Sequence, residues 1–304
     1  MDTVTEKATD TAMDPAIKTE NKAGENGEWS LIISPASGWF NINLKELWNY
    51  KDLIFLFVWR DFVSLYKQTI LGPLWFFIQP VLTTLTFTVI FGNIAQLSTD
   101  GLPPVLFYLA GITCWNYFAD CLTKTSNTFT ANAGIFGKVY FPRLVLPLSI
   151  VISNLVKFGL QFLIFLVIYF YFIFSGQGIY ANSAILIFPV LIIMMAGLGL
   201  GMGIVISSLT TKYRDLQQLI AFGVQLLMYA SPIVYPLTSV PGKYKWVLLL
   251  NPMTSIIEAF KYSFLGAGIF SPVGLIYSFL FMCGILLAGI VIFSKVEKSF
   301  MDTV

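Results

Sequence analysis

Two long apolar stretches without any charge, Leu144–Val156 and Phe158–Phe174, constrain this chain more than any other feature. Roughly 18 to 20 consecutive apolar residues are enough for a helix to cross the hydrocarbon core of a bilayer. Only 11% of the 304 residues are charged, whereas soluble domains carry roughly a quarter. So few charges cannot cover a water-exposed surface, and the sequence predicts an all-α integral membrane protein.

Apolar length predicts six transmembrane helices. The predicted spans are Ile70–Ile94, Pro104–Leu122, Leu144–Phe174, Ser183–Leu209, Gln217–Tyr235 and Val273–Ser294. Short loops rich in Lys and Arg stay in the cytoplasm. Eleven Lys and Arg residues fall in the segments on one side, and only Lys243, Lys245 and Lys261 fall on the other. We therefore expect the N- and C-termini to be cytoplasmic.

Two regions of different composition precede the first span. Residues 1–37 are polar, with an excess of acidic side chains, and we expect them to be disordered. Residues 38–69 contain an apolar run from Leu53 to Val58 that is too short to span and is flanked by charges and aromatics. This pattern is typical of an amphipathic helix in the headgroup region, although an ordinary membrane-flanking anchor also explains it. Residues 70–304 then form the transmembrane domain.

The segment before the last span is too polar for a regular crossing and too apolar for a solvated loop. Asn251 and Pro252 are typical of a helix N-cap followed by a first-turn proline. Glu258 and Lys261, three residues apart on that helix, are able to pair. We interpret the segment as two short re-entrant helices. Amphipathic helices resting on the outer surface are the alternative.

The sequence contains no catalytic constellation. It has no histidine and no phosphate-binding loop with its lysine. Its four closely spaced glycines, Gly197, Gly199, Gly201 and Gly203, lie among apolar residues, where they allow neighbouring helices to approach. The net charge of +2, from dispersed basic residues, argues against a nucleic-acid partner, and the cysteines lack metal-ligand spacing. We expect no enzyme activity, metal or cofactor on this chain.

Lys157 lies between the two charge-free stretches, and a charge at such depth is costly. Asp120, near the inner end of the second span, can pair with it if the two helices are neighbours. Alternatively, the first turns of the long third helix project inward and let Lys157 reach the interface. A functional and a structural interpretation of Lys157 are equally open.

The predicted inner loop, Lys124–Arg143, ends in a basic and aromatic motif. Its candidate docking residues are Lys138, Tyr140, Phe141, Pro142 and Arg143. Proline disfavours helix at the residue before it, which separates the loop from the next span. Tyr, Phe and Arg are favoured at protein interfaces, so we interpret the motif as a docking surface for another subunit. An ordinary positively charged inner loop is the alternative.

Aromatic residues make up 16% of the chain, and many fall within the predicted spans. Such rings facing an interior path would stack on the apolar faces of sugars. The candidates for such a lining are Trp75, Phe76, Tyr108, Trp115, Tyr117 and Lys157. The sequence does not distinguish the helix faces, so packing against lipid or other helices is equally compatible.

A set of motifs between about Gly38 and Lys298 resembles the permease subunits of ABC-2 type exporters of polysaccharides. The motifs are Asn43–Trp48, Trp59–Asp61, Tyr66–Thr69, Leu71–Trp75, Lys138–Arg143, Tyr213–Leu216, Ser231–Pro236 and Asn251–Met253. Members of this family move O-antigen, capsule or teichoic-acid chains. Each motif alone is modest, and their common order carries the resemblance.

The resemblance implies a homodimer that works with two separate ABC ATPase subunits, which would bind ATP and magnesium. It assigns the docking motif to the coupling helix, and Trp59, Arg60, Asp61, Tyr66 and Lys67 to a lateral gate for an undecaprenyl-diphosphate-linked polysaccharide. It places the chain in a bacterial inner membrane. The alternatives are an ABC-2 permease for a drug or small lipid, an ion-coupled transporter or channel, and a membrane scaffold.

Overall fold

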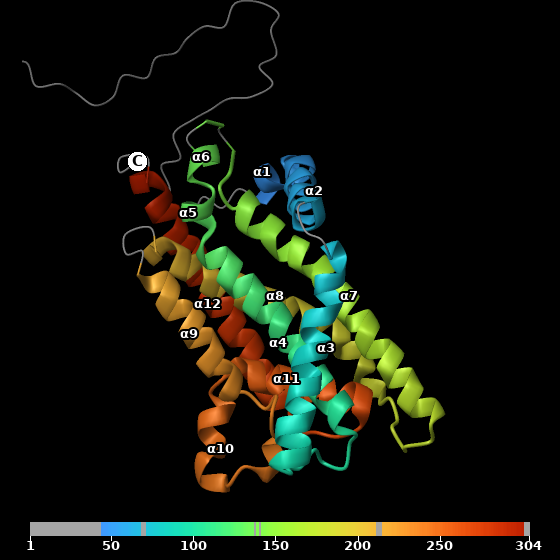
Figure 1. Ribbon diagram of the computed structural model, residues 1–304. Coiled ribbons are helices and arrows are strands. Elements are labelled where there is room, and N and C mark those ends of the chain that lie inside the picture. Colours follow the sequence, from blue (N-terminus) through green and yellow to red (C-terminus); the bar gives the residue numbers. More distant parts are fainter. Residues whose placement is uncertain (1–43, 68–70, 137, 140, 211–214, 301–304) are drawn as a thin grey trace, which may run out of the picture. The chain divides into compact units, whose positions relative to one another are not determined.

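The computed structural model describes residues 44–67, 71–136, 138–139, 141–210 and 215–300. Within these ranges every regular element is a helix (Figure 1), which confirms the predicted all-α class. The predicted acidic tail, residues 1–37, lies outside the described residues.

Five helices are long and apolar enough to cross a membrane, and they correspond to five of the six predicted spans. Their bounds are α3 (Trp75–Phe87, prolonged by the π-helical η2, Thr88–Ile94), α4 (Pro104–Ser126), α7 (Val145–Phe174), α8 (Phe188–Thr210, preceded by η3, Ser183–Ile187) and α12 (Pro272–Phe300). Helix α8 packs against α4 and α12, and α4 also packs against α3 and α7. The long helices therefore form one packed bundle.

Helix α8 approaches two neighbours closely because glycines face both of them. A Cβ atom on Gly199 would lie 2.6 Å from the Cβ of Cys121 in α4. One on Gly201 would lie 2.9 Å from a side-chain carbon of Ile285 in α12. Such distances leave no room for a side chain, so the glycines serve helix packing, as their spacing predicts.

The fifth predicted span is shorter in the structure than in the prediction. Helix α9 comprises the 14 residues Leu216–Tyr229 and does not reach Tyr235. Pro232 lacks an N–H group and disfavours the helical conformation at Ser231, so the helix ends before this pair. Fourteen helical residues are about 21 Å long, less than the roughly 30 Å of a hydrocarbon core.

Short helices lie at both ends of the bundle (Figure 1). Near the C-terminal part of α12 are α1 (Leu44–Asn49), α2 (Lys51–Lys67), α5 (Thr128–Ala131) and α6 (Ala133–Phe136). The short turn η1 (Gly72–Leu74) joins this end to α3. Toward the opposite end lie η4 (Leu237–Ser239), α10 (Gly242–Leu249) and α11 (Pro252–Leu265).

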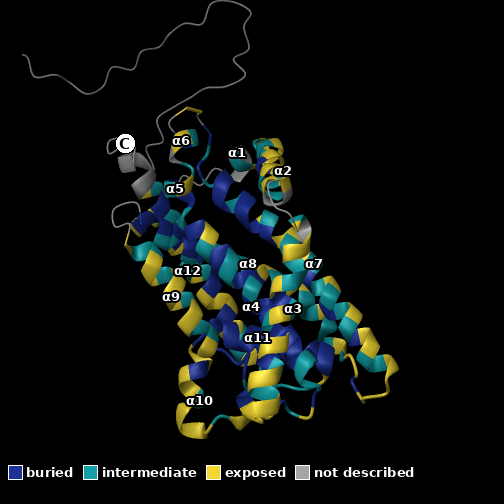
Figure 2. Ribbon diagram, in the orientation of Figure 1, coloured by how far each residue is buried: buried dark blue, intermediate teal, exposed yellow. Residues whose placement is uncertain are grey.

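The buried residues concentrate where α4, α8 and α11 meet, whereas α9 and α10 are largely exposed (Figure 2). Large apolar side chains are among the exposed residues, including Val167 at 61% and Ile193 at 61%. Apolar groups directed outward from a helical bundle are expected when lipid is the solvent.

Candidate functional site

The predicted gate helix and the predicted docking loop share one apolar cluster. On α2, which packs along α7, the side chains of Ile54 and Phe57 are buried. The Phe57 ring lies 5.8 Å from the ring of Phe141 in the loop, and Phe141 stacks on Phe136 of α6 at 5.7 Å. The docking loop and α2 are therefore in direct contact through these rings.

The polar residues of α2 remain accessible beside this cluster. Trp59 is 63% exposed, and Lys67 is exposed at the end of the helix. The Arg60 guanidinium pairs with the neighbouring Asp61 carboxylate at 2.7 Å, and the two side chains are 42% and 27% exposed. The Tyr66 side chain lies outside the described part of the chain. The structure thus brings Trp59, Arg60 and Lys67 to one exposed helix.

The docking motif divides into an exposed and a buried part. Lys138 is exposed, whereas Phe141 and Arg143 are 5% and 6% exposed, and Pro142 is half-buried. The Arg143 guanidinium lies 5.5 Å from the centre of the Phe136 ring in α6. Tyr140 is outside the described residues. Phe141 and Arg143 therefore fix the loop's shape, and Lys138 is available to a partner.

Lys157 and Asp120 form the ion pair that the sequence suggested. The Lys157 ammonium lies 2.6 Å from a carboxylate oxygen of Asp120, and the two side chains are 16% and 29% exposed. Helix α7 has 30 residues and is about 45 Å long, longer than the roughly 30 Å core of a bilayer. The Phe76 ring of α3 also lies 5.9 Å from the ammonium.

The predicted aromatic lining separates into buried and exposed members. Tyr108, Trp115 and Tyr117 on α4 are 0%, 3% and 3% exposed, inside the core of this chain. Trp75 is 49% exposed at the start of α3, and Phe76 beside it is half-buried. Of the rings in this set, Trp75 presents the most exposed surface.

Helix α11 lies within the protein rather than on its surface. Its N-cap forms as predicted, because the Asn251 side-chain oxygen accepts the Met253 N–H at 3.0 Å and Pro252 occupies the first turn. Helices α4, α8 and α12 pack against it, and all residues from Pro252 to Lys261 are buried. This burial disfavours the alternative in which α11 rests on the outer surface. Helix α10, by contrast, is largely exposed.

The predicted pairing of Glu258 with Lys261 is replaced by a backbone partner for each charge. The Lys261 ammonium donates to the Pro232 carbonyl at 2.6 Å and lies 3.4 Å from the Phe107 ring centre. The Glu258 carboxylate accepts the Ile269 N–H at 2.9 Å.

Comparisons of the sequence with known proteins give consistent matches. A family model described as ABC-2 type transporter matches residues 52–265. An O-antigen export system permease protein RfbA of Klebsiella pneumoniae is 29% identical over 254 residues, which cover 83% of this chain and 94% of that protein.

Two further relatives extend the similarity. An O-antigen export system permease protein RfbA of Myxococcus xanthus is 26% identical, over 72% of this chain and 82% of that protein. The polysialic acid transport protein KpsM of Escherichia coli is 24% identical, over 80% of this chain and 93% of that protein. The named relatives therefore match this chain over most of their own length.

Proposed function

The chain belongs to the ABC-2 type transporter family, and from this premise we propose that it is the permease subunit of an ATP-driven polysaccharide exporter. Its cargo would be a lipid-linked chain of the O-antigen, capsule or teichoic-acid type, carried out of the cytoplasm. The observation that carries this proposal is the similarity, along nearly their whole length, to proteins named for O-antigen export and polysialic acid transport. The chain itself would carry out no catalysis.

We further propose six crossings of a bacterial cytoplasmic membrane, with both termini inside. Helix α9 would make the fifth crossing together with the buried segment 231–234 that follows it. Helices α10 and α11 would form the re-entrant element of the outer half, which the burial of α11 supports. Helix α2, which precedes the first span, and the C-terminal part of α12 lie at the same end of the bundle (Figure 1). A chain whose two ends lie on one side of the membrane crosses it an even number of times, which supports six crossings.

The proposed assembly contains two copies of this chain and two ABC ATPase subunits, on which ATP and magnesium would bind. The ATPase would dock on the loop between α4 and α7. The exposure of Lys138 supports this assignment, and the buried Phe141 and Arg143 would hold the loop in a fixed shape. No catalytic group on this chain is required.

In the proposed mechanism, closure of the ATPase subunits pushes the docking loop, and the loop displaces α2. The ring contacts from Phe136 through Phe141 to Phe57 provide the route. Displacement of α2 would open a lateral gate to the undecaprenyl diphosphate end of the polymer. The exposed Arg60 and Lys67 would attract its phosphates, since guanidinium and ammonium groups suit phosphate oxygens.

Removal of the gene tests the proposed function. We expect the deletion strain to lose the polymer from the cell surface and to accumulate it, still attached to lipid, inside the cell. Surface labelling with a polymer-specific antibody and extraction of cytoplasmic lipid-linked polymer measure the two quantities. Normal surface polymer in the deletion strain would contradict a role in polysaccharide export, and a drug-sensitivity phenotype alone would indicate another cargo.

A further inference from the structure

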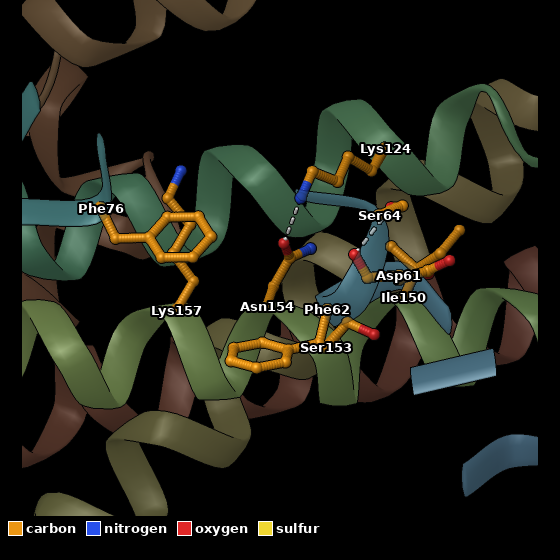
Figure 3. A pocket seen from close by; sticks show the side chains of 9 residues that line it. All are labelled: Asp61, Phe62, Ser64, Phe76, Lys124, Ile150, Ser153, Asn154 and Lys157. Carbon is orange, nitrogen blue, oxygen red and sulfur yellow. Dashed lines mark hydrogen bonds between the residues drawn. The ribbon is translucent and has the colours of Figure 1, made fainter. Parts of the chain in front are cut away.

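Lys261 of α11 is buried in the protein, unlike two other lysines of the bundle. Lys124 and Lys157 are among the residues that line a pocket of about 200 Å³ between α2, α3, α4 and α7 (Figure 3). Lys261 is only 1% exposed. A buried ammonium loses its hydration, so it persists only where other groups compensate for that loss. The groups around Lys261 therefore indicate what its burial achieves.

Three parts of the fold surround the Lys261 ammonium. It donates at 2.6 Å to the carbonyl of Pro232, in the break segment (residues 230–234) that follows α9. It lies 3.4 Å from the centre of the Phe107 ring of α4, and the face of an aromatic ring attracts a cation. Glu258, one turn earlier on α11, has the opposite charge and attracts Lys261. Lys261 thus connects the break segment to α4 and α11.

The end of α9 is satisfied by groups of its own neighbourhood. A helix that stops within a membrane leaves its last four carbonyl groups without helical donors. The Ser231 hydroxyl donates to the Leu227 carbonyl at 2.8 Å, and the Tyr235 hydroxyl donates to the Tyr229 carbonyl at 2.9 Å. The backbone N–H groups of residues 230 and 231 serve the other two carbonyls. The helix end itself therefore does not require α11.

The break segment, by contrast, depends on two side chains from α11. Lys261 provides the donor for the Pro232 carbonyl. The side-chain nitrogen of Asn251, the N-cap of α11, lies 3.4 Å from the Ala230 carbonyl oxygen and donates to the Ser231 hydroxyl at 2.8 Å. Asn251 and Lys261 lie toward opposite ends of α11, so the helix holds the break segment at two points.

The break segment is the buried part of the fifth predicted crossing. None of the 14 residues of α9 is buried, whereas Ile233 and Val234 are 0% and 4% exposed. A Cβ atom on Gly111 of α4 would lie 3.2 Å from the Cα of Ile233, so the two backbones approach closely. The position of α9 in the bundle therefore depends on how the break segment is held.

We propose that Lys261 is a positioning residue for transport, which holds the break segment against α4 and α11 so that the fifth crossing and α11 keep one relative position. This inference rests on the proposed export function, in which α10 and α11 form the re-entrant element. An apolar side chain of similar size would fill the site without burying a charge. It would leave the buried Pro232 carbonyl without a donor, which is unfavourable. The ammonium group is therefore needed for the hydrogen bond and not for the packing.

The decisive comparison is between Lys261→Met and Lys261→Arg. Methionine is unbranched and close to lysine in size but cannot donate, whereas arginine keeps the charge and the donors but is larger. The matched control is Lys243→Met, which removes one positive charge from an exposed position on α10. Val234→Cys, combined with each variant, adds a reporter thiol to the buried break segment.

The first measurement is the rate at which a polar maleimide labels Val234→Cys in the purified full-length chain in detergent. The same chain without the reporter gives the contribution of its own cysteines. We expect Lys261→Met to raise the rate about tenfold or more, the scale of one lost hydrogen bond to a charged group, because the break segment opens more often. Lys243→Met should leave the rate unchanged, and Lys261→Arg should raise it less than Lys261→Met.

Two labelling results would overturn the proposal. One is an unchanged rate in the Lys261→Met chain, which would show that the hydrogen bond does not hold the break segment. The other is a rate in the Lys261→Arg chain that equals or exceeds that of Lys261→Met, because the size of the side chain would then matter more than its donors.

The second measurement compares polymer export with ATP hydrolysis in complexes that contain the ATPase partner. We expect Lys261→Met to lower export several-fold while hydrolysis continues, a change that loss of assembly would not produce. Normal export by Lys261→Met would overturn the role in transport. Normal surface polymer in the deletion strain would remove the export function but leave the labelling result intact, so the two failures are distinguishable.

Discussion

Individual glycines determine how closely α8 packs, and their two faces serve two different partners. Gly199 faces α4, where an added Cβ would also meet the Phe118 carbonyl oxygen at 3.1 Å. Gly201 faces α12, where it would lie 3.0 Å from the backbone nitrogen of Leu286. Backbone atoms cannot rotate away as a flexible side chain can. A methyl group at either glycine therefore forces two helices apart.

We predict that Gly199→Ala destabilises the protein by about 1–3 kcal/mol, as overpacking of a dense interior generally does. Gly223→Ala on α9 is the matched control, because nothing lies within 4 Å of the added methyl group. The control should change the stability by no more than about 1 kcal/mol, the range of helix propensity between the two residues. Thermal unfolding of both variants in detergent measures the difference. Equal melting temperatures for the two would contradict the packing argument.

Single residues were predictable from the sequence when the signal was local. The glycine spacing, the N-cap at Asn251 and the position of Lys157 between two charge-free stretches are all visible within a few residues. The bond from Lys124 to the side-chain oxygen of Asn154 is not, because the two residues are 30 positions apart in the chain. Likewise, the pairing of Glu258 with Lys261 followed from helical spacing, but more distant backbone groups provide the partners.

At the scale of elements, the contact between α2 and the docking loop is the link on which the proposed mechanism depends. Phe57 is 7% exposed, whereas Phe55 on the same helix is 76% exposed. The two residues have the same side chain but different surroundings, which makes them a matched pair for substitution.

We predict that Phe57→Leu lowers polymer export several-fold while the assembled complex continues to hydrolyse ATP. Leucine keeps the site apolar and tolerates burial, but it removes the ring that contacts Phe141 at 5.8 Å. Phe55→Leu should export normally. Surface polymer is measured per copy of the membrane protein, and ATPase activity in purified complexes. Full export by Phe57→Leu would show that this contact transmits no movement.

The helices themselves were largely predictable because apolar length is a strong signal. Five long spans were confirmed, whereas the helix of the fifth predicted span ends at Tyr229. Hydropathy continues past that residue, but Pro232 interrupts the backbone hydrogen bonds. The burial of Phe57 against the loop was not predictable, because the contact joins segments far apart in the chain.

At the scale of the whole molecule, the features with proposed roles in coupling and substrate entry lie at one end of the bundle. The docking loop and the gate helix α2 both adjoin the first turns of α7. The buried helix α11 lies toward the other end. An exporter driven from the cytoplasm needs its docking surface for the motor and its substrate entrance on the same side of the membrane. In the proposed exporter this chain forms the path, while another subunit supplies the energy.

Transport by inside-out membrane vesicles tests that claim most directly. The vesicles would contain this chain, its ATPase partner and lipid-linked polymer exposed on the outside, and the measurement is the fraction of polymer protected from an added glycosidase. We predict protection that requires ATP, this chain and a hydrolytically active partner together. Protection in vesicles that lack this chain, or equal protection with a hydrolysis-deficient partner, would contradict it.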